Sequence, residues 1–279
     1  MEKAVWKIYM KNVKVCVLSG YGINCDRETG FAFELAGAKS TRVHLNSLFD
    51  GSARLEDFQI LAFPGGFSWG DDHGAGVIQA ARMKTNMGES LREFVEAGKL
   101  VIGICNGFQV LVNLGLLPGF DHAPSARLAA LTYNDCGNFR NDWVNLEANL
   151  DSPSVFTRGM PPMELPIRHG EGKFVIDPDS RAMLEKNNQI ALRYALPEGG
   201  PACGAFPHNP NGSVDDIAGI CDPTGRIFGL MPHPEAFNHW TNHPSWTRMR
   251  EELKRKKEPF LTEMTPGVRM FKNGVDFFG

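Results

Sequence analysis

The sequence predicts a doubly wound α/β fold with a mostly parallel sheet, flanking helices and an added antiparallel edge. Up to Leu114, short uncharged runs typical of strands buried on both faces alternate with amphipathic stretches. From about Pro118 to Gly225, short β-like runs alternate with glycine, proline and asparagine turns, as in antiparallel hairpins. The chain has 279 residues, of which 42% are hydrophobic, enough for one large domain with a sizeable core.

The first part of the chain supplies the alternating elements. Strands are expected over residues 13–19, 40–44, 59–63 and 100–104. Helices are expected over 27–36 and 77–97, and Gly37 and Gly98 can stop them. A sheet built from such alternating elements is parallel, and its active site lies at the carboxyl ends of the strands.

The second part supplies the antiparallel edge. The β-like runs are residues 128–133, 143–146, 164–168, 173–176, 189–194 and 217–221, and a last buried strand is expected over 226–231. We place a domain boundary after residue 237. Residues 238–279 then form a C-terminal extension that contains a charged helix over 248–258 and an extended strap packed on the core or on a partner.

Composition excludes several classes of function. A net charge of −3 gives no argument for binding nucleic acid or an anionic membrane. The six cysteines lack zinc or disulfide spacing, so we expect no metal site and a reducing compartment. No run approaches the roughly 18 apolar residues of a membrane span, and the first residues do not resemble a signal peptide. We therefore expect a soluble cytoplasmic protein.

The chemistry centres on a cysteine directly after the strand at 100–104. Gly103-Ile-Cys105-Asn-Gly107 has the pattern of a strand-to-helix elbow that presents a nucleophile, with cysteine in the place of serine. The start of the following helix favours a thiolate, and the amide of Asn106 points to where an oxyanion would form. The alternative interpretation is a buried structural cysteine.

A histidine and a carboxylate follow the last expected strand, in Pro232-His233-Pro234-Glu235. Prolines on both sides favour an extended segment, in which residues two apart project to the same side. Glu235 can then accept a hydrogen bond from the imidazole of His233. A surface or core histidine is the alternative.

The strand at 59–63 ends in Pro64-Gly65-Gly66, where adjacent glycines let the backbone approach a ligand closely. An ordinary strand-to-helix turn would have the same composition. Since Cys105 also lies at the carboxyl end of a strand, we expect both segments at one site.

These segments together resemble the class I (triad) glutamine amidotransferases, which have a flavodoxin-like fold. Within that class the sequence is most similar to the glutaminase subunits of phosphoribosylformylglycinamidine synthases. The motifs that carry this resemblance are Gly-Tyr-Gly-Ile-Asn-Cys-Asp (20–26), Phe-Pro-Gly-Gly-Phe-Ser-Trp-Gly-Asp (63–71), Arg-His-Gly-Glu-Gly (168–172), Asn-Pro-Asn-Gly-Ser (209–213) and Gly-Leu-Met-Pro-His-Pro-Glu (229–235). The resemblance covers about residues 13–237. Ala236 stands where the family often has arginine, and the segment after 237 is longer than usual.

The resemblance implies a cysteine mechanism for hydrolysis of L-glutamine. Cys105 would form a γ-glutamyl thioester, His233 would pass its proton to the leaving ammonia, and Glu235 would orient the imidazole. The amides of Asn106 and Gly66 would form the oxyanion hole.

The substrate contacts implied by the resemblance are Gln109, Gly65 and Phe67. From its spacing alone, Gln109 is equally compatible with a solvated helix residue. The loop with His169 and Glu171 would border an ammonia path or a partner interface, because its glycines suit a backbone held near another surface.

The resemblance also implies partners. The chain has no phosphate-binding loop, so no cofactor is expected on it. A synthetase subunit would bind ATP and magnesium and use the ammonia to convert formylglycinamide ribonucleotide to formylglycinamidine ribonucleotide in purine biosynthesis. A small accessory subunit would complete the complex.

Two other interpretations stay open at this point. Another class I glutamine amidotransferase, or a free-standing cysteine hydrolase of related fold, would share the cysteine and histidine but not the partner. A free-standing hydrolase should be fully active alone. A non-catalytic relative would need neither Cys105, His233 nor Glu235, and all are present.

Overall fold

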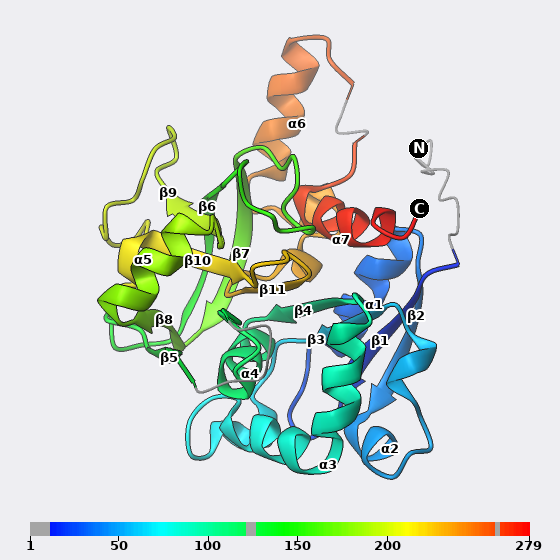
Figure 1. Ribbon diagram of the computed structural model, residues 1–279. Helices are drawn as coiled ribbons and strands as arrows, with labels where there is room; N and C mark the ends of the chain where they lie inside the picture. The colour runs from blue at the N-terminus through cyan, green and yellow to red at the C-terminus, as the bar shows by residue number, and fades with distance from the viewer. Residues whose placement is uncertain (1–11, 121–126, 260–262) are drawn as a thin grey trace.

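The computed structural model describes residues 12–120, 127–259 and 263–279. Within these residues a nine-stranded sheet forms the centre of the molecule, with the strand order β2-β1-β3-β4-β11-β10-β9-β6-β7 (Figure 1). Helices cover both faces of this sheet, as a doubly wound fold requires. The predicted fold class is confirmed.

One half of the sheet is parallel and contains the strands β2 (Lys39–His44), β1 (Lys14–Ser19), β3 (Ile60–Phe63), β4 (Leu100–Ile104) and β11 (Ile227–Leu230). Every residue of β3, β4 and β11 is buried, which explains why these strands are uncharged. The register places Gly229 of β11 beside Gly103 of β4, one step before the end of each strand. The carboxyl ends of β3, β4 and β11 therefore lie side by side.

The other half is antiparallel and contains β10 (Ile217–Cys221), β9 (Ile190–Ala195), β6 (Arg140–Ala148) and β7 (Met163–His169). The prediction of an antiparallel edge is thus confirmed. Two of the predicted runs do not join it, because β5 (Ala129–Tyr133) and β8 (Glu171–Ile176) pair with each other in a separate two-stranded sheet.

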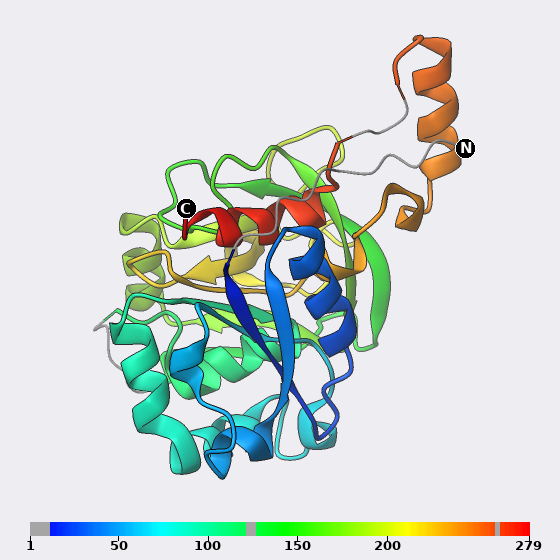
Figure 2. The same cartoon turned by 90° about the vertical axis from the view of Figure 1, so that its right-hand side faces the viewer.

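Two groups of helices cover the sheet. On one side lie α3 (Val77–Glu96) and α4 (Asn106–Leu114), which pack against each other, and the short α2 (Leu45–Phe49) packs against α3. On the other side α1 (Asp26–Leu35) packs against α7 (Pro266–Asp276) (Figures 1 and 2). Short 3-10 turns complete the described structure: η1 (Leu55–Asp57), η2 (Ser68–Asp71), η3 (Val214–Asp216), η4 (Pro234–Ala236) and η5 (Trp240–Asn242).

Helix α5 (Pro178–Lys186) and helix α2 were not predicted. The signal for α5 is present in the sequence, since Asp177 caps the amides of Asp179 and Ser180 and proline occupies the first turn. It lies among β-like runs, so the local pattern favoured a hairpin. Helix α2 has only five residues, too few to show a helical period.

The C-terminal extension contains two helices. The expected charged helix is α6 (Trp246–Arg255), which has no buried residue and projects from the body of the molecule (Figure 2). The expected extended strap is wrong, because this segment forms α7 and buries the face that contains Val268, Met270 and Phe271. Phe271 meets Phe33 of α1 edge-on, with ring centroids 4.8 Å apart. The domain boundary at 237 stays a prediction.

Within the described residues, none of the helices combines the length and the apolar character that a membrane crossing needs.

Candidate active site

Cys105 occupies a sharp turn between β4 and α4. Its backbone has φ 51° and ψ −107°, a conformation that costs a residue with a side chain on the order of 1–3 kcal/mol. The turn also needs glycine at position 107, since a β-carbon there would lie 1.9 Å from the carbonyl oxygen of Phe63 at the end of β3. The elbow predicted from the sequence is therefore present and is packed directly on the neighbouring strand.

The side chain of Cys105 is buried, with 6% of its surface exposed. Its Sγ lies 3.7 Å from the carbonyl oxygen of Arg168, at the end of β7. The sulfur therefore lies close to the end of β7, in the antiparallel half of the sheet.

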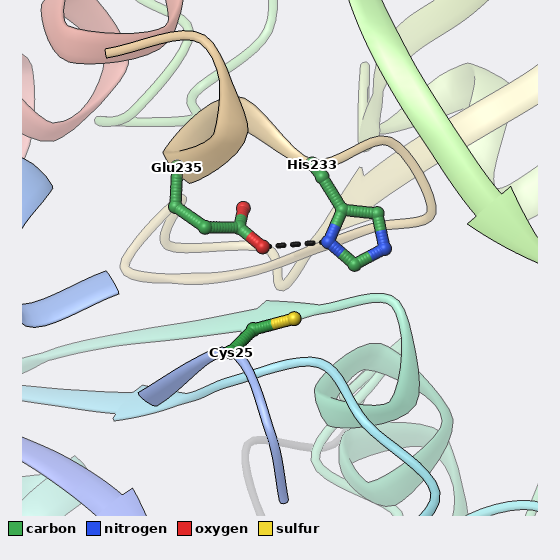
Figure 3. Close-up of side chains that lie close together, drawn as sticks. All are labelled: Cys25, His233 and Glu235. Carbon is green, nitrogen blue, oxygen red and sulfur yellow. Dashed lines mark hydrogen bonds and ion pairs between the residues drawn. The ribbon is translucent and has the colours of Figure 1, made fainter. Parts of the chain in front are cut away.

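His233 and Glu235 form a buried hydrogen-bonded pair beside this elbow. The distance from His233 Nδ1 to Glu235 Oε1 is 2.6 Å, and the side chains are 2% and 1% exposed (Figure 3). The predicted pairing is correct, but the predicted extended backbone is wrong. Pro234 starts the 3-10 turn η4, with His233 as its N-cap, and this turn brings the carboxylate back to the imidazole.

The surroundings of His233 favour its protonated form. Burial is the largest influence and acts against a charged imidazole, but the negative charges of Glu235 and then Cys105 outweigh it. Together they raise the pKa of His233 well above its ordinary value of 6.5. Because Cys105 is among these causes, its sulfur is close enough to the imidazole of His233 to change the pKa of that ring.

Gly65 lies against the same histidine, and Gly66 lies against the loop after β1. A β-carbon on Gly65 would lie 2.7 Å from Cε1 of His233, and one on Gly66 would lie 2.6 Å from the carbonyl oxygen of Gly22. The amides of Asn24 and Cys25 both donate to the carbonyl oxygen of Gly65, at 3.2 Å each. The loop after β1 thus fixes the loop after β3 beneath the imidazole.

The predicted substrate residue Phe67 does not join the buried cluster. Its side chain is 46% exposed, and its ring centroid lies 6.4 Å from that of Phe139. The structure therefore places Phe67 on the surface next to the site, and its role in binding stays a prediction.

Asn106 and Gln109 form a buried polar chain at the start of α4. Asn106 Nδ2 donates to Gln109 Oε1 at 3.1 Å, and Gln109 Nε2 donates to the carbonyl oxygen of Glu171 at 2.6 Å. Gln109 is only 4% exposed, so the alternative of a solvated helix residue is excluded. This chain ties the elbow to the loop that contains His169 and Glu171.

Asp71 also belongs to this chain, although the sequence motif that contains it does not by itself predict a role for the carboxylate. Its Oδ1 accepts from Asn106 Nδ2 at 3.1 Å. Partial burial and then the charge of Glu171 raise the pKa of Asp71 to about 6, against the opposing effect of the Asn106 hydrogen bond. Trp69 and Asp71 both have φ 54°, so a strained turn holds this carboxylate in place.

His169 lies inside the protein, with 2% of its surface exposed. Its Nδ1 lies 3.1 Å from Asn134 Oδ1. Burial, and then the charge of His233, lower the pKa of His169 to about 3, so the ring is neutral near pH 7. Glu171 is half-buried beside it. The structure brings both residues close to the candidate site, and their place on an ammonia path or interface stays a prediction.

Cys25 is a second cysteine at this site that the sequence interpretation left without a role. Its sulfur points toward the imidazole of His233, from the loop after β1 (Figure 3). Burial raises the pKa of the Cys25 thiol. The side chain is half-buried and its Sγ lies 3.2 Å from Asn24 Oδ1.

Comparison with known proteins agrees with this geometry. Residues 12–278 match the family described as CobB/CobQ-like glutamine amidotransferase domain. The match continues past residue 237, so the C-terminal extension lies within it.

Among curated proteins, the chain is 46% identical to phosphoribosylformylglycinamidine synthase subunit PurQ of Methanococcus maripaludis, over 95% of this chain and 97% of that protein. It is 43% identical to the protein of the same description from Dehalococcoides mccartyi, over 95% and 98% of the two chains. Among solved structures, PurLQS from Thermotoga maritima matches with a TM-score of 0.68 and 28% identity, over 96% of this chain and all of that one.

Proposed function

The chain belongs to the CobB/CobQ-like glutamine amidotransferase family, as an enzyme of the PurQ type. We propose that it hydrolyses L-glutamine through Cys105 and delivers the ammonia to a synthetase subunit. The synthetase would convert formylglycinamide ribonucleotide to formylglycinamidine ribonucleotide in purine biosynthesis. The observation that supports the catalytic role is the location of Cys105 on a strained elbow, where its charge acts on the hydrogen-bonded pair of His233 and Glu235.

In the first step the sulfur of Cys105 attacks the side-chain amide carbon of glutamine. A sulfur–carbon bond forms, the carbon–nitrogen bond breaks, and a proton held by His233 leaves with the ammonia. Water then attacks the thioester, which releases glutamate and returns the proton to the enzyme. Because the thioester divides a difficult reaction into two easier ones, a cysteine suits this chemistry.

Glu235 would act as the positioning residue for His233. With Nδ1 turned to the carboxylate, Nε2 is the nitrogen left to exchange protons at the reacting atoms, and it has no hydrogen-bond partner among the described residues. Holding the imidazole in this orientation is the function of the third member of a triad.

The amides of Asn106 and Gly66 would bind the oxyanion of the tetrahedral intermediate. This assignment is supported by the position of Asn106 in the first turn of α4 and by the contact of the adjacent Gly65 with His233. Loss of one such donor typically costs about 10²–10³ in rate. Gln109, Gly65 and Phe67 would contact the substrate.

The partner assignments extend the proposal beyond this chain. A solved relative is described as PurLQS, which supports assembly with a synthetase. We assign ATP and magnesium to that synthetase, a small accessory subunit to the complex, and the cytoplasm as the location. His169 and Glu171 would border the ammonia path or the partner surface. The backbone carbonyl of Glu171 accepts a hydrogen bond from Gln109, which places this loop at the site.

The test separates ammonia production from ammonia use. Cys105→Ala, reconstituted with the synthetase, should give no product from glutamine and an undiminished rate with ammonium salt. Cys136→Ala, at a half-buried cysteine of another loop, is the matched control and should use both nitrogen sources. A free-standing hydrolase would show no synthesis that ammonium restores. Retained glutamine-dependent synthesis by Cys105→Ala would overturn the proposal.

A further inference from the structure

Cys25, His233 and Glu235 bring three different metal-binding groups together. One donor atom from each, a sulfur, a ring nitrogen and a carboxylate oxygen, lies within 4.8 Å of the other two. The residues come from separate parts of the fold, since Cys25 is in the loop after β1 and the other two belong to the turn after β11 (Figure 3). The proposed hydrolysis of glutamine uses His233 and Glu235 but has no function for Cys25.

Two polar atoms of this group are buried without a partner. Among the described residues, neither Glu235 Oε2 nor His233 Nε2 has a hydrogen-bond partner. A buried polar atom left in this state costs about 1–3 kcal/mol, and more when the group is charged. A second donor or a cation would satisfy the free carboxylate oxygen. Figure 3 shows this oxygen on the side of the carboxylate away from Cys25, so an ion shared with Cys25 requires the carboxylate to turn.

We propose that Cys25, His233 and Glu235 form a binding site for a single Zn²⁺ ion, and that occupation of this site switches off the glutaminase. Thiolate, imidazole and carboxylate are the ligands that zinc takes in proteins, at about 2.3 Å from sulfur and about 2.0–2.2 Å from nitrogen and oxygen. Ligands at those distances around a tetrahedral ion lie roughly 3.3–3.8 Å apart. The 2.6 Å hydrogen bond between His233 Nδ1 and Glu235 Oε1 therefore has to open, and a donor as far as 4.8 Å from another has to approach it by about 1 Å. The fourth position is left to water.

The location of Cys25 gives the ion a way in. His233 and Glu235 are 2% and 1% exposed, whereas Cys25 is half-buried and is thus the member of the group that solvent reaches most easily. The Cys25 thiol and the imidazolium of His233 each release a proton to solvent as the ion binds, because the thiolate and the neutral imidazole are the forms that bind metal.

Binding at this site would stop catalysis by removing the proton carrier. An imidazole that is bonded to zinc through one nitrogen, and whose carboxylate partner is also a ligand, cannot pass a proton to the leaving ammonia. This consequence rests on the proposed function, whereas the existence of the site does not.

The test of binding removes Cys105, so that the catalytic sulfur cannot take the metal. Full-length Cys105→Ser protein is titrated with Zn²⁺ by calorimetry and with Co²⁺, whose bond to a thiolate is visible as an absorption band. We expect one ion per chain and a thiolate–cobalt band. Since loss of even an outer partner of a metal ligand costs 10–100-fold in affinity, Cys105→Ser/Cys25→Ser should bind at least about 100-fold more weakly.

The matched control is Cys105→Ser/Cys136→Ser, which loses a half-buried cysteine elsewhere and should keep both the affinity and the band. Thermal melting checks that each variant is folded. Absence of binding to folded Cys105→Ser, or equal binding to the Cys25→Ser variant, would overturn the site.

Inhibition is measured on the complete enzyme. The Zn²⁺ concentration that halves glutamine hydrolysis should rise at least tenfold in Cys25→Ser, and a chelator should restore the activity of the original protein. An unchanged inhibitory concentration would overturn the switch. A chain that binds zinc as expected but never hydrolyses glutamine would refute the proposed function and leave the site standing.

Discussion

A β-carbon on Gly267 would lie only 2.2 Å from the carbonyl oxygen of Pro234. The start of α7 is therefore packed directly on η4, the turn that contains Glu235. The hydroxyl of Thr265, the N-cap of α7, donates to the carbonyl oxygen of Phe237 just beyond this turn. The C-terminal extension thus supports the backbone of the candidate triad from the outside.

We expect Gly267→Ala to push α7 and η4 apart. Overpacking of this kind costs about 1–3 kcal/mol in the free energy of unfolding. Since a shift of about 1 Å at reacting groups costs up to roughly 10²-fold, glutaminase kcat should fall by about tenfold or more. The measurements are urea denaturation and steady-state hydrolysis of glutamine.

Gly88→Ala is the matched control for this prediction. Gly88 lies in α3 with nothing within 4 Å of an added β-carbon, so alanine should stabilise the helix by up to about 1 kcal/mol and leave kcat unchanged. Equal behaviour of the two variants would show that α7 does not support the turn.

Glu235→Gln should change the pH dependence of hydrolysis as well as its rate. Glutamine keeps an oxygen acceptor for His233 Nδ1 but removes the charge that raises the pKa of His233. The imidazolium is then lost at a lower pH, and the alkaline limb of the kcat/KM profile should move to lower pH. The rate at the optimum should fall by about 10²-fold or more. An unchanged alkaline limb would show that Glu235 does not raise the pKa of the group that supplies the proton.

His169→Asn should reduce the sensitivity of the protein to acid. The folded-state pKa of His169 is lowered to about 3, so between about pH 6.5 and 3 only the unfolded chain takes up this proton. Stability is therefore lost as the pH falls through that range, by at most about 1.4 kcal/mol per pH unit. Asparagine can donate to Asn134 in the place of Nδ1 and does not titrate.

The measurement is the free energy of unfolding in urea at pH 7 and pH 5. The asparagine variant should lose less stability between these values than the original protein. His73→Gln, at an exposed histidine, controls for the loss of one histidine. Parallel losses in the original protein and His169→Asn would contradict the assignment of a neutral buried ring.

Asp71→Asn should stabilise the protein at pH 8. The pKa of Asp71 is raised to about 6 in the folded state, so its ionised form opposes folding above that pH. Because the side chain is partly exposed, solvent screening limits the gain to on the order of 1 kcal/mol. The difference should vanish below about pH 4, where the carboxyl is protonated in both states. Asp72→Asn, at the exposed neighbour, controls for the loss of one negative charge, and an equal gain there would contradict the prediction.

Local sequence was sufficient where a few neighbouring residues define the structure. The elbow at Cys105 follows from an uncharged strand, flanking glycines and a helical stripe within a short stretch of chain. The pairing of His233 with Glu235 was also predicted, although the wrong backbone was assigned to it. Spacing limits which side chains can meet, and both a 3-10 turn and an extended segment allow residues two apart to do so.

Elements that depend on tertiary packing were missed or misassigned. Helix α7 was expected as an extended strap, since its apolar residues signal helix only once one face is buried against Phe33 and the turn after β11. The spacing of Gln109 is compatible with either a solvated or a buried side chain. Its hydrogen bond to the loop that contains Glu171 holds it in the buried position.

Contiguous residues are enough to predict the class of fold, the candidate nucleophile and the pair that would serve it. The way in which the chain folds brings Cys25 beneath His233, joins Asp71 to the chain of Asn106 and Gln109, and makes His169 buried and neutral. The physical reason is the sheet order, which places β1, β3, β4 and β11 side by side. Loops that are far apart in the chain therefore meet at one edge, where burial and neighbouring charges set the chemistry of each group.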